Sequence, residues 1–439
     1  MIKKMTMAML VTGLAACGGE SSDPSPNPVV EPRLSNCFWN GPYVKENPAA
    51  NFAYPDSGAA YWTAEYSLPE GATLKLDGEF PYSRYISYNS YRSDGSPADV
   101  IADNNIVPEQ GAVNPFVNGN PRQGEHRGYQ IEVAAGSVPE NRDENTLYDN
   151  AEGGKSILMY RIYVPDDGKG ILGGVELPEV AVTTADGIKH TGDDPCEQID
   201  AQQKLVQIPR VPEEAYAQAR QNNPARMPPI WQAIYNFQWG SECGFYYLCD
   251  TDPVRQVGWF ANLDNQYMSS FLDRSIKPVV VIRGKIPATP KTLDGDAYFD
   301  TSEAQLRYWS ICQNEYYSQR VEACLYDEQI TINPDGKFTI VTSTEADRPQ
   351  NASEECGMGF LPWPENGDGF SVVEGREDNP DDALVIVRNM QPMNGFDQAI
   401  QDTQTPGDEA EVLGEYLPSI EYYTTEEFEA LGCDAYNAL

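Results

Sequence analysis

The sequence has little histidine and few basic residues. Only two of its 439 residues are histidines, and 30 lysines and arginines stand against 67 aspartates and glutamates, a formal net charge of −37. A surface of this sign repels the nucleic-acid backbone, so the composition argues against nucleic acid as a partner. Hydrophobic residues nevertheless make up 40% of the chain, and 26 residues are tyrosines. The chain can therefore form folded cores.

Familiar catalytic and metal-binding motifs are also missing. The sequence contains no G-x-S-x-G, H-E-x-x-H, S-x-x-K or C-x-x-C pattern. Neither His126 nor His190 sits beside another cluster of metal ligands in the sequence, so no zinc site is predicted. The acidic run with Asp294, Asp296 and Asp300 lacks the EF-hand order, and we interpret it as a solvated insertion. We predict neither a metal nor a cofactor.

Long hydrophobic runs are absent, and the apolar segment at the N-terminus is short. Lys3 and Lys4 precede the apolar run from Met5 to Leu14. This run is shorter than the ~20 residues that a transmembrane helix needs, and its order is typical of a signal peptide. No other segment is apolar enough to span a membrane. We therefore predict an exported protein.

The signal ends in Leu14-Ala15-Ala16-Cys17, which resembles the bacterial lipobox. The resemblance implies that residues 1–16 are removed and that Cys17 carries lipid, which would attach the protein to a membrane. An ordinary signal peptide followed by a coincidental cysteine is the alternative. Residues 17–36 are polar and predict a flexible tether. Gly18, where the family's retention signal has aspartate, implies the outer membrane in a Gram-negative cell, on its periplasmic face or at the cell surface.

Eight cysteines follow Cys17 in the sequence. An even number in an exported chain favours four disulfides. The short spacings predict the pairs Cys243–Cys249 and Cys312–Cys324, and a pair Cys356–Cys433 would tie the C-terminal tail to the second unit. The spacing leaves the other pairings open. The disulfide candidates are Cys37, Cys196, Cys243, Cys249, Cys312, Cys324, Cys356 and Cys433.

The sequence contains an internal duplication. The segment Phe52–Asp56 recurs as Phe260–Asp264, and an Arg-Tyr-x-Ser box follows each copy. Later matches keep the same order in both copies. The matched positions include Tyr61 with Tyr267, Arg84 with Arg307, Tyr85 with Tyr308, Asp103 with Asp327, and Arg161 with Arg388. We therefore predict two copies of one structural unit, at residues 37–190 and 240–395.

The local pattern of both copies is that of β-strands. Short runs rich in β-branched and aromatic residues are separated by turn signals such as SDGSP and NPDGK. We predict a mainly β fold of two tandem antiparallel β-sandwich, jelly-roll-like units. The linker 191–239 should contain a short helix at Pro212–Gln221. The tail 396–439 should be helical, with a capping box at Thr424 and Glu427.

The repeated units resemble a bacterial family. In the second copy, Asn262, Asp264 and Tyr267 precede the box Arg307–Ser310, and the loop Phe360–Pro364 follows a later strand pair. This constellation resembles the exported proteins built from the domains of unknown function 1254 and 1214. The resemblance covers most of residues 50–395 and implies a fold without implying a reaction. The predicted disulfides and the tyrosine-rich first copy depart from the family pattern.

The Arg-Tyr boxes admit two interpretations. Their arginines and aromatic residues could bind an anionic or hydroxylated ligand. Alternatively, Arg84 and Arg307 are structural and pair with Asp56 or Asp264 of their own unit, which repetition in both copies favours. The binding candidates are Arg84, Tyr85, Arg307, Tyr308 and Trp309, with Trp239 and Trp259 from the aromatic segment 231–260.

This aromatic segment lies where the two units meet in the sequence. Aromatic faces in a groove between domains commonly bind sugars or apolar ligands, although the same residues could simply form the interface. We predict a lipid-anchored cell-envelope protein that acts as a binding or scaffold module for a glycan, lipid or protein. The alternatives are an extracytoplasmic enzyme that acts on polysaccharide or lipid through carboxylates, and a structural surface component.

Overall fold

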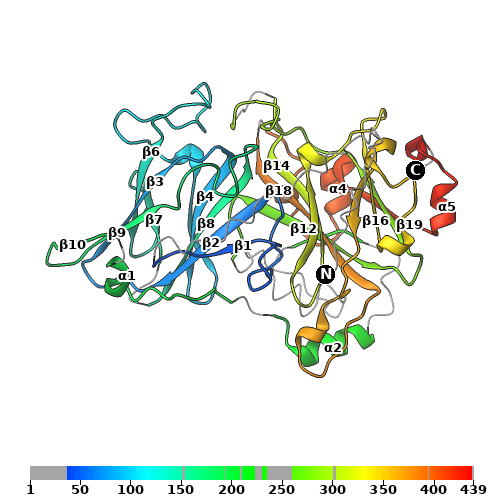
Figure 1. Ribbon diagram of the computed structural model, residues 1–439, viewed down its shortest axis with the longest axis horizontal. Coiled ribbons are helices and arrows are strands. Elements are labelled where there is room, and N and C mark those ends of the chain that lie inside the picture. The colour runs from blue at the N-terminus through cyan, green and yellow to red at the C-terminus, as the bar shows by residue number, and fades with distance from the viewer. Residues whose placement is uncertain are drawn as a thin grey trace, which may run out of the picture. The chain divides into compact units, whose positions relative to one another are not determined.

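The described residues of the computed structural model form four β-sheets (Figure 1). The structure describes residues 37–150, 154–192, 194–207, 210–222, 230–234, 260–299, 303–393 and 395–437. Residues 34–439 form one compact unit, which contains all four sheets. Among the described residues, no helix has both the length and the apolar character required to cross a membrane.

The first sandwich packs two five-stranded sheets against each other. One sheet has the order β1 (Asn40–Tyr43), β2 (Ala59–Tyr66), β8 (Ser156–Pro165), β4 (Ser83–Arg92) and β5 (Pro97–Ala102). The other has the order β10 (Lys189–His190), β9 (Glu179–Thr183), β3 (Thr73–Glu79), β6 (Gly128–Ala134) and β7 (Thr146–Tyr148). In β6, Tyr129, Ile131 and Val133 are buried and their neighbours are not, which is the alternation of a half-buried strand.

The second sandwich repeats this plan. Its first sheet has the order β11 (Gln232–Ala233), β12 (Asn265–Asp273), β18 (Asp382–Pro392), β14 (Leu306–Asn314) and β15 (Val321–Tyr326). Its second sheet has the order β17 (Gly359–Pro362), β16 (Phe338–Ser343), β13 (Val279–Gly284) and β19 (Ser419–Tyr423). Pairing is antiparallel except for β6 with β7 and β16 with β17, which are parallel at equivalent places.

The strand registers confirm the duplication. Ser87 lies opposite Arg161 in the first sandwich, and the matched Ser310 lies opposite Arg388 in the second. Even an unusual backbone conformation recurs, because Val164 and Gln391, each three residues after the matched arginine, have φ of 46° and 44°. The two predicted β-sandwich units are therefore correct, and they share one detailed geometry.

Helices are short and lie outside the sheets. Among the described residues they are α1 (Pro195–Gln198), α2 (Glu213–Asn222), α4 (Glu409–Leu413) and α5 (Thr425–Glu429). Helix α2 confirms the predicted linker helix. The capping box of Thr424 and Glu427 is also confirmed at α5. Single 3-10 turns occur at η1 (Asp103–Asn105), η3 (Asp327–Gln329), η4 (Glu345–Asp347), η5 (Glu354–Cys356), η6 (Phe370–Val372), η7 (Ile400–Asp402), η8 (Gly414–Tyr416) and η9 (Ala435–Asn437).

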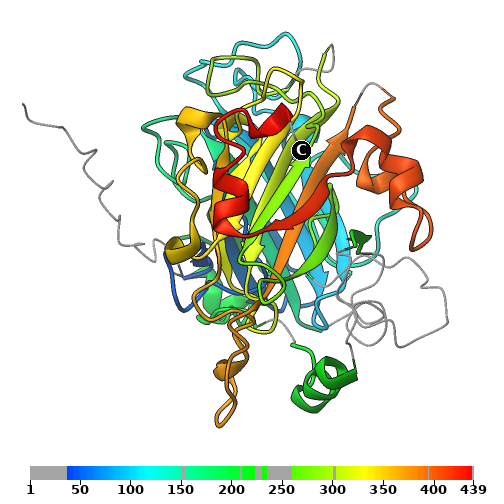
Figure 2. The same ribbon diagram turned by 90° about the vertical axis from the view of Figure 1, so that its right-hand side faces the viewer.

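The linker and the tail also contribute strands, which the sequence pattern did not predict. β11 lies within the predicted linker and pairs with β12. β19 lies within the predicted helical tail and pairs with β13 along its whole length. Helix α5 then lies over the outer face of this sheet, where Phe428 packs with Val279 and Val281 (Figure 2). The tail is therefore part of the second sandwich.

Three disulfides join described residues. They are Cys37–Cys196, Cys312–Cys324 and Cys356–Cys433. The last two confirm the predicted pairs. The first joins the beginning of the first sandwich, just before β1, to the segment that follows β10. Cys243 and Cys249 lie outside the described residues. Together the three bonds fit an exported protein.

Candidate functional site: a pocket between the two sandwiches

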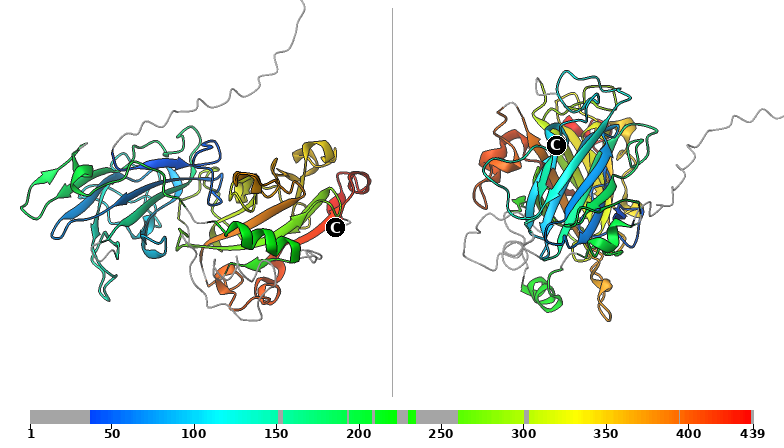
Figure 3. Two further views of the ribbon diagram at one scale, coloured as in Figure 1. Left: turned by 90° about the horizontal axis from the view of Figure 1, so that it is seen from below. Right: turned by 90° about the vertical axis from the view of Figure 1, so that its left-hand side faces the viewer.

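The two sandwiches meet through the sheets that contain β2 and β12 (Figure 3). Alternate residues of β2 divide between two cores. Trp62 packs inside the first sandwich, whereas Tyr61 joins a separate cluster that also contains Tyr308 and Met390 of the second sandwich. Strand β2 is therefore buried on both of its faces. The tyrosine-rich outer face of the first sandwich forms the interface between the units.

Reciprocal ion pairs cross this interface. Arg84 donates through Nη1 to both carboxylate oxygens of Asp327 at 2.7 Å, and it also contacts Glu328. Arg307 donates to the two carboxylate oxygens of Asp103 at 3.1 and 3.0 Å. Because Arg84 matches Arg307 and Asp103 matches Asp327, the two copies face each other as a pseudo-twofold pair. The second copy adds a carboxylate, since Glu328 stands where the first copy has Asn104.

The predicted structural pairs were therefore wrong in their partners. Neither arginine binds an aspartate of its own unit. Asp56 and Asp264 instead accept hydrogen bonds from the box tyrosine of the opposite unit, Tyr308 to Asp56 Oδ1 at 2.9 Å and Tyr85 to Asp264 Oδ2 at 2.5 Å. Burial and the neighbouring Asp264 raise the pKa of Tyr85 well above 10, so its phenol remains a neutral donor.

The binding candidates of the Arg-Tyr boxes are all buried. Arg84, Tyr85, Arg307 and Tyr308 are fully enclosed between the sandwiches. Trp309 instead belongs to the core of the second sandwich, where its ring lies 5.4 Å from that of Phe338. These side chains contact protein and present no open surface to a ligand. The remaining candidates, Trp239 and Trp259, lie outside the described residues.

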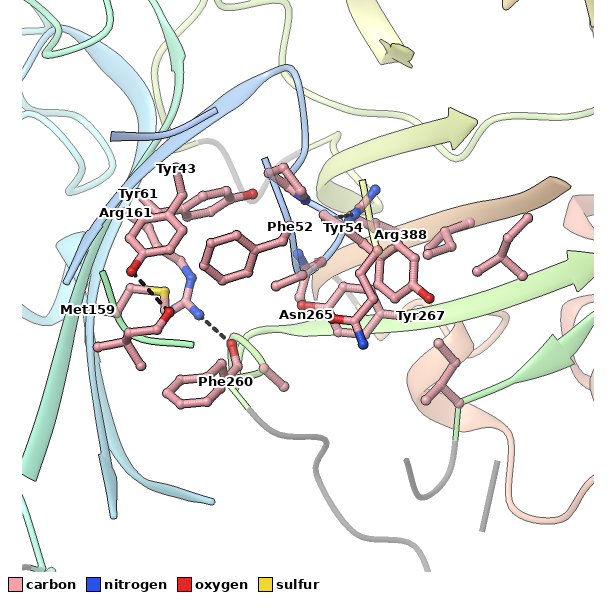
Figure 4. Close-up of a pocket in the computed structure, with 18 of the residues that line it drawn as sticks. Tyr43, Phe52, Tyr54, Tyr61, Met159, Arg161, Phe260, Asn265, Tyr267 and Arg388 are labelled. Carbon is pink, nitrogen blue, oxygen red and sulfur yellow. Dashed lines mark hydrogen bonds between the residues drawn. The ribbon is translucent and has the colours of Figure 1, made fainter. Parts of the chain in front are cut away.

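A pocket lies beside these ion pairs, in the same interface. The centres of water-sized molecules can occupy about 170 Å³ of it. Figure 4 shows Tyr61 and Arg161 on one side, Tyr267 and Arg388 across from them, and Phe52 between. Most of the lining is aromatic or aliphatic, which is typical of small-molecule sites. Its aromatic residues are Tyr43, Phe52, Tyr54, Tyr61, Tyr163, Phe260, Tyr267, Tyr316 and Tyr317.

The duplication builds the pocket. Matched positions of the two copies line it together, so that it lies along the pseudo-twofold relation. These pairs are Phe52 with Phe260, Ala53 with Ala261, Tyr61 with Tyr267, Met159 with Ile386, and Arg161 with Arg388. Several of these pairs are matched positions of the internal duplication, but they were not predicted to form a site. Their repetition was the available signal, but sequence alone did not show that they converge.

Strained backbone at the pocket directs two carbonyl groups toward the arginines. Tyr54 has a backbone φ of 53° and Phe260 one of 54°. Residues other than glycine rarely adopt this left-handed conformation. The Tyr54 carbonyl accepts from Arg388 Nη2 at 2.6 Å, and the Phe260 carbonyl accepts from Arg161 Nη2 at 2.7 Å. Each copy thus provides a carbonyl acceptor for an arginine of the other.

The charge of the pocket is opposite to that of the protein. Arg161 and Arg388 are both almost fully buried and contribute to its lining. None of the described lining residues is an aspartate, a glutamate, a histidine or a cysteine. Burial raises the pKa of Tyr43 and Tyr61 to about 12, so both phenols are neutral near pH 7. The pocket therefore offers cations, neutral donors and apolar faces. These groups suit binding better than acid–base or nucleophilic chemistry.

The structure describes two aromatic residues of the segment 231–260, Trp231 and Phe260, and they lie in different places. Phe260 lines the pocket, but Trp231 packs inside the core of the second sandwich and donates to the Pro418 carbonyl at 2.7 Å. The other aromatic residues of this segment lie outside the described residues.

The acidic insertion is partly solvated and partly packed against the protein. Asp294 and Asp296 are exposed as predicted, while Tyr298 enters the core of the first sandwich.

Comparisons with known proteins identify no family. No family model matches the chain, and no curated protein matches it. Among solved structures, an uncharacterised protein from Burkholderia cenocepacia has a TM-score of 0.45 and 10% identity, over 86% of this chain and 79% of that chain. A protein from Vibrio parahaemolyticus has a TM-score of 0.37 and 15% identity, over 80% of this chain and 88% of that chain. The resemblance to the 1254/1214 domains stays a prediction.

Proposed function

We propose that this protein is a lipid-anchored binding module of the cell envelope, which holds a small and largely apolar molecule in the pocket between its sandwiches. The observation that carries the proposal is that equivalent residues of both copies line one aromatic pocket. A single sandwich would supply only half of this lining. The need to enclose a ligand therefore accounts for the presence of two units in one chain.

Several features support the envelope location and the attachment. The disulfides fit an oxidising compartment, and the lipobox-like sequence at Cys17 would anchor the chain beyond a polar tether. The outer membrane is the expected site in a Gram-negative cell. A binding role fits the pocket better than an enzyme that acts through carboxylates, because the described lining of the pocket contains no carboxylate.

Native mass spectrometry tests this proposal. The Cys17→Ala protein, purified from an oxidising compartment of its own host, should retain a small organic molecule whose mass exceeds that of the bare chain. Ala261→Leu should reduce the retained fraction because Ala261 lines the pocket. Ala410→Leu, at an exposed position of α4, is the matched control and should leave it unchanged. A bare mass, together with no thermal stabilisation by a library of small molecules, would contradict the proposal.

A further inference from the structure

We infer that the ligand of this pocket is a small organic anion, a carboxylic acid with an apolar body, whose acidic group is bound by Arg161. This inference rests on the proposed binding function and adds the chemical class of the ligand. It follows from an asymmetry between the two matched arginines of the pocket, Arg161 and Arg388.

Arg388 is fully provided with partners. Its Nη1 lies 3.7 Å from Asp56 Oδ2 and donates to Cys312 Sγ at 2.7 Å. Its Nη2 donates to the Tyr54 carbonyl. The guanidinium of Arg388 therefore has both a counter-charge and hydrogen-bond acceptors within the protein.

Arg161 lacks the equivalent counter-charge. Its Nη2 donates to Tyr91 Oη at 2.6 Å and to the Phe260 carbonyl, whereas its buried Nη1 has no hydrogen-bond partner. The matched carboxylate, Asp264, is hydrogen-bonded to Tyr85. Within the described ranges, Arg161 forms no ion pair. Burial opposes the charged form of Arg161, but beside the Tyr91 hydroxyl its pKa stays above the usual value, so it remains charged.

A buried guanidinium without a counter-ion is strongly unfavourable, whereas the same group paired with an anion is stable. The exposed fraction of Arg161 is only 3%, so bulk water does not replace the missing partner. The protein has 67 acidic residues, yet none of those described lines this pocket. An anion that enters the pocket would supply the missing charge and accept from Nη1.

Asn265 provides a second polar group in the pocket. Its side chain is buried, and neither its Oδ1 nor its Nδ2 has a hydrogen-bond partner. An orphaned amide costs stability unless a ligand or a bound water satisfies it. Between these polar groups, Phe52, Tyr61 and Tyr267 provide the apolar faces that would cover the body of the ligand. A carboxylic acid with an aromatic or branched body and one further polar group fits this arrangement.

The test compares matched acids and amides on the intact Cys17→Ala protein. Isothermal titration calorimetry at pH 7 would use 3-phenylpropionate, indole-3-acetate and octanoate, each beside its neutral amide. We expect at least one acid to bind at least tenfold more tightly than its amide, since a charge-assisted hydrogen bond exceeds a neutral one by about this factor. If amides bind as tightly as their acids, the inference is wrong and the proposed binding function stands. If no acid or amide binds at 10 mM, both fail.

Variants test whether Arg161 causes the preference for acids over amides. Arg161→Gln should weaken acid binding at least tenfold and leave amide binding within twofold. Arg376→Gln changes the net charge equally at a side chain that is 41% exposed and outside the pocket lining, and it should leave both unchanged. Asn265→Ala should weaken acids and amides alike. Unchanged acid binding in Arg161→Gln would overturn the inference. If that variant does not fold, the acid–amide comparison on the parent protein decides.

Discussion

Arg84 of the first sandwich binds Asp327 of the second through both carboxylate oxygens, and its counterpart Arg307 binds Asp103 in the reverse direction. Each aspartate also accepts from the backbone of the Arg-Tyr box in its own unit. Asp103 accepts from the Ile86 amide at 2.8 Å, and Asp327 accepts from the Trp309 amide at 3.0 Å. One carboxylate therefore secures a strand within its unit and an arginine across the interface.

Breaking either reciprocal pair should destabilise the whole protein. Asp103→Asn leaves the buried Arg307 without its charge partner, and we expect a loss of about 3–5 kcal/mol in the free energy of unfolding. Asp327→Asn should cost less, because Arg84 keeps its ion pair with Glu328. Urea denaturation measures this loss. Glu345→Gln is the control, because the Glu345 side chain is 71% exposed in its pair with Arg348, and it should change stability by less than about 0.5 kcal/mol. A loss below about 1 kcal/mol for both aspartates would contradict the role of these pairs.

Removing Arg161 should behave differently from removing Arg84. Arg84→Met leaves buried carboxylates unpaired and should cost about 3–5 kcal/mol. Arg161→Met removes a buried charge that has no carboxylate partner. Without ligand, the free energy of unfolding of this variant should therefore stay within about 1 kcal/mol of that of the parent protein. Thermal and urea denaturation of the two variants side by side would show this contrast. Equal, large losses would mean that Arg161 is satisfied without a ligand.

Stability should fall in alkali as buried tyrosines are forced to ionise. Burial raises the pKa of Tyr61 and Tyr91 from 10.0 to about 12. Their contribution to stability is complete below pH 10, where both states are protonated, and is lost as pH rises through 12 because the unfolded state releases its protons first. A difference of one between the pKa values of the folded and unfolded states corresponds to about 1.4 kcal/mol per tyrosine. Absorbance at 295 nm and near-ultraviolet circular dichroism should change together, and free titration of all tyrosines near pH 10 in a folded protein would contradict this.

Loss of the Cys37–Cys196 disulfide should destabilise the first sandwich. This bond closes a sequence separation of 159 residues, whereas Cys312–Cys324 closes only 12. In the chain-entropy account, the longer loop contributes more, and typical losses are about 2–5 kcal/mol. The double variant Cys37→Ala/Cys196→Ala should therefore melt at a lower temperature than the double variant of the shorter loop. An unchanged melting temperature would contradict a stabilising role for the longer bond.

Substitution of Cys17 should release the protein from membranes. Without the thiol, Cys17→Ala cannot accept lipid, and the chain should be recovered in the soluble fraction at its unlipidated mass. Ser21→Ala in the tether is the control and should remain with the membranes. Fractionation and intact-mass measurement distinguish the two. A Cys17→Ala protein that still partitions with membranes would show that lipid on this cysteine is not the anchor.

Much of the fold followed from local patterns in the sequence. Alternating apolar residues predicted the strands, the Thr424–Glu427 spacing predicted a helix cap, and repeated motifs predicted two units. These features depend on neighbours along the chain. The strand β19 was missed, because its residues Ser419–Tyr423 are partly exposed and lie among helical signals. Only pairing with β13 makes them a strand.

The site depended on contacts between the copies. Each repeat contains the same arginine and aspartate. The arginine could pair with the aspartate of its own copy or with that of the other copy, and the sequence is compatible with both arrangements. Docking of the sandwiches decided for the crossed arrangement, which places Asp103 against Arg307. The same docking left Arg388 beside Asp56 and Arg161 without a carboxylate. The sequence by itself determined the repeated β-unit, because strand and turn preferences are local. Only the tertiary structure decided which charges meet, because that depends on distances between residues far apart in the chain.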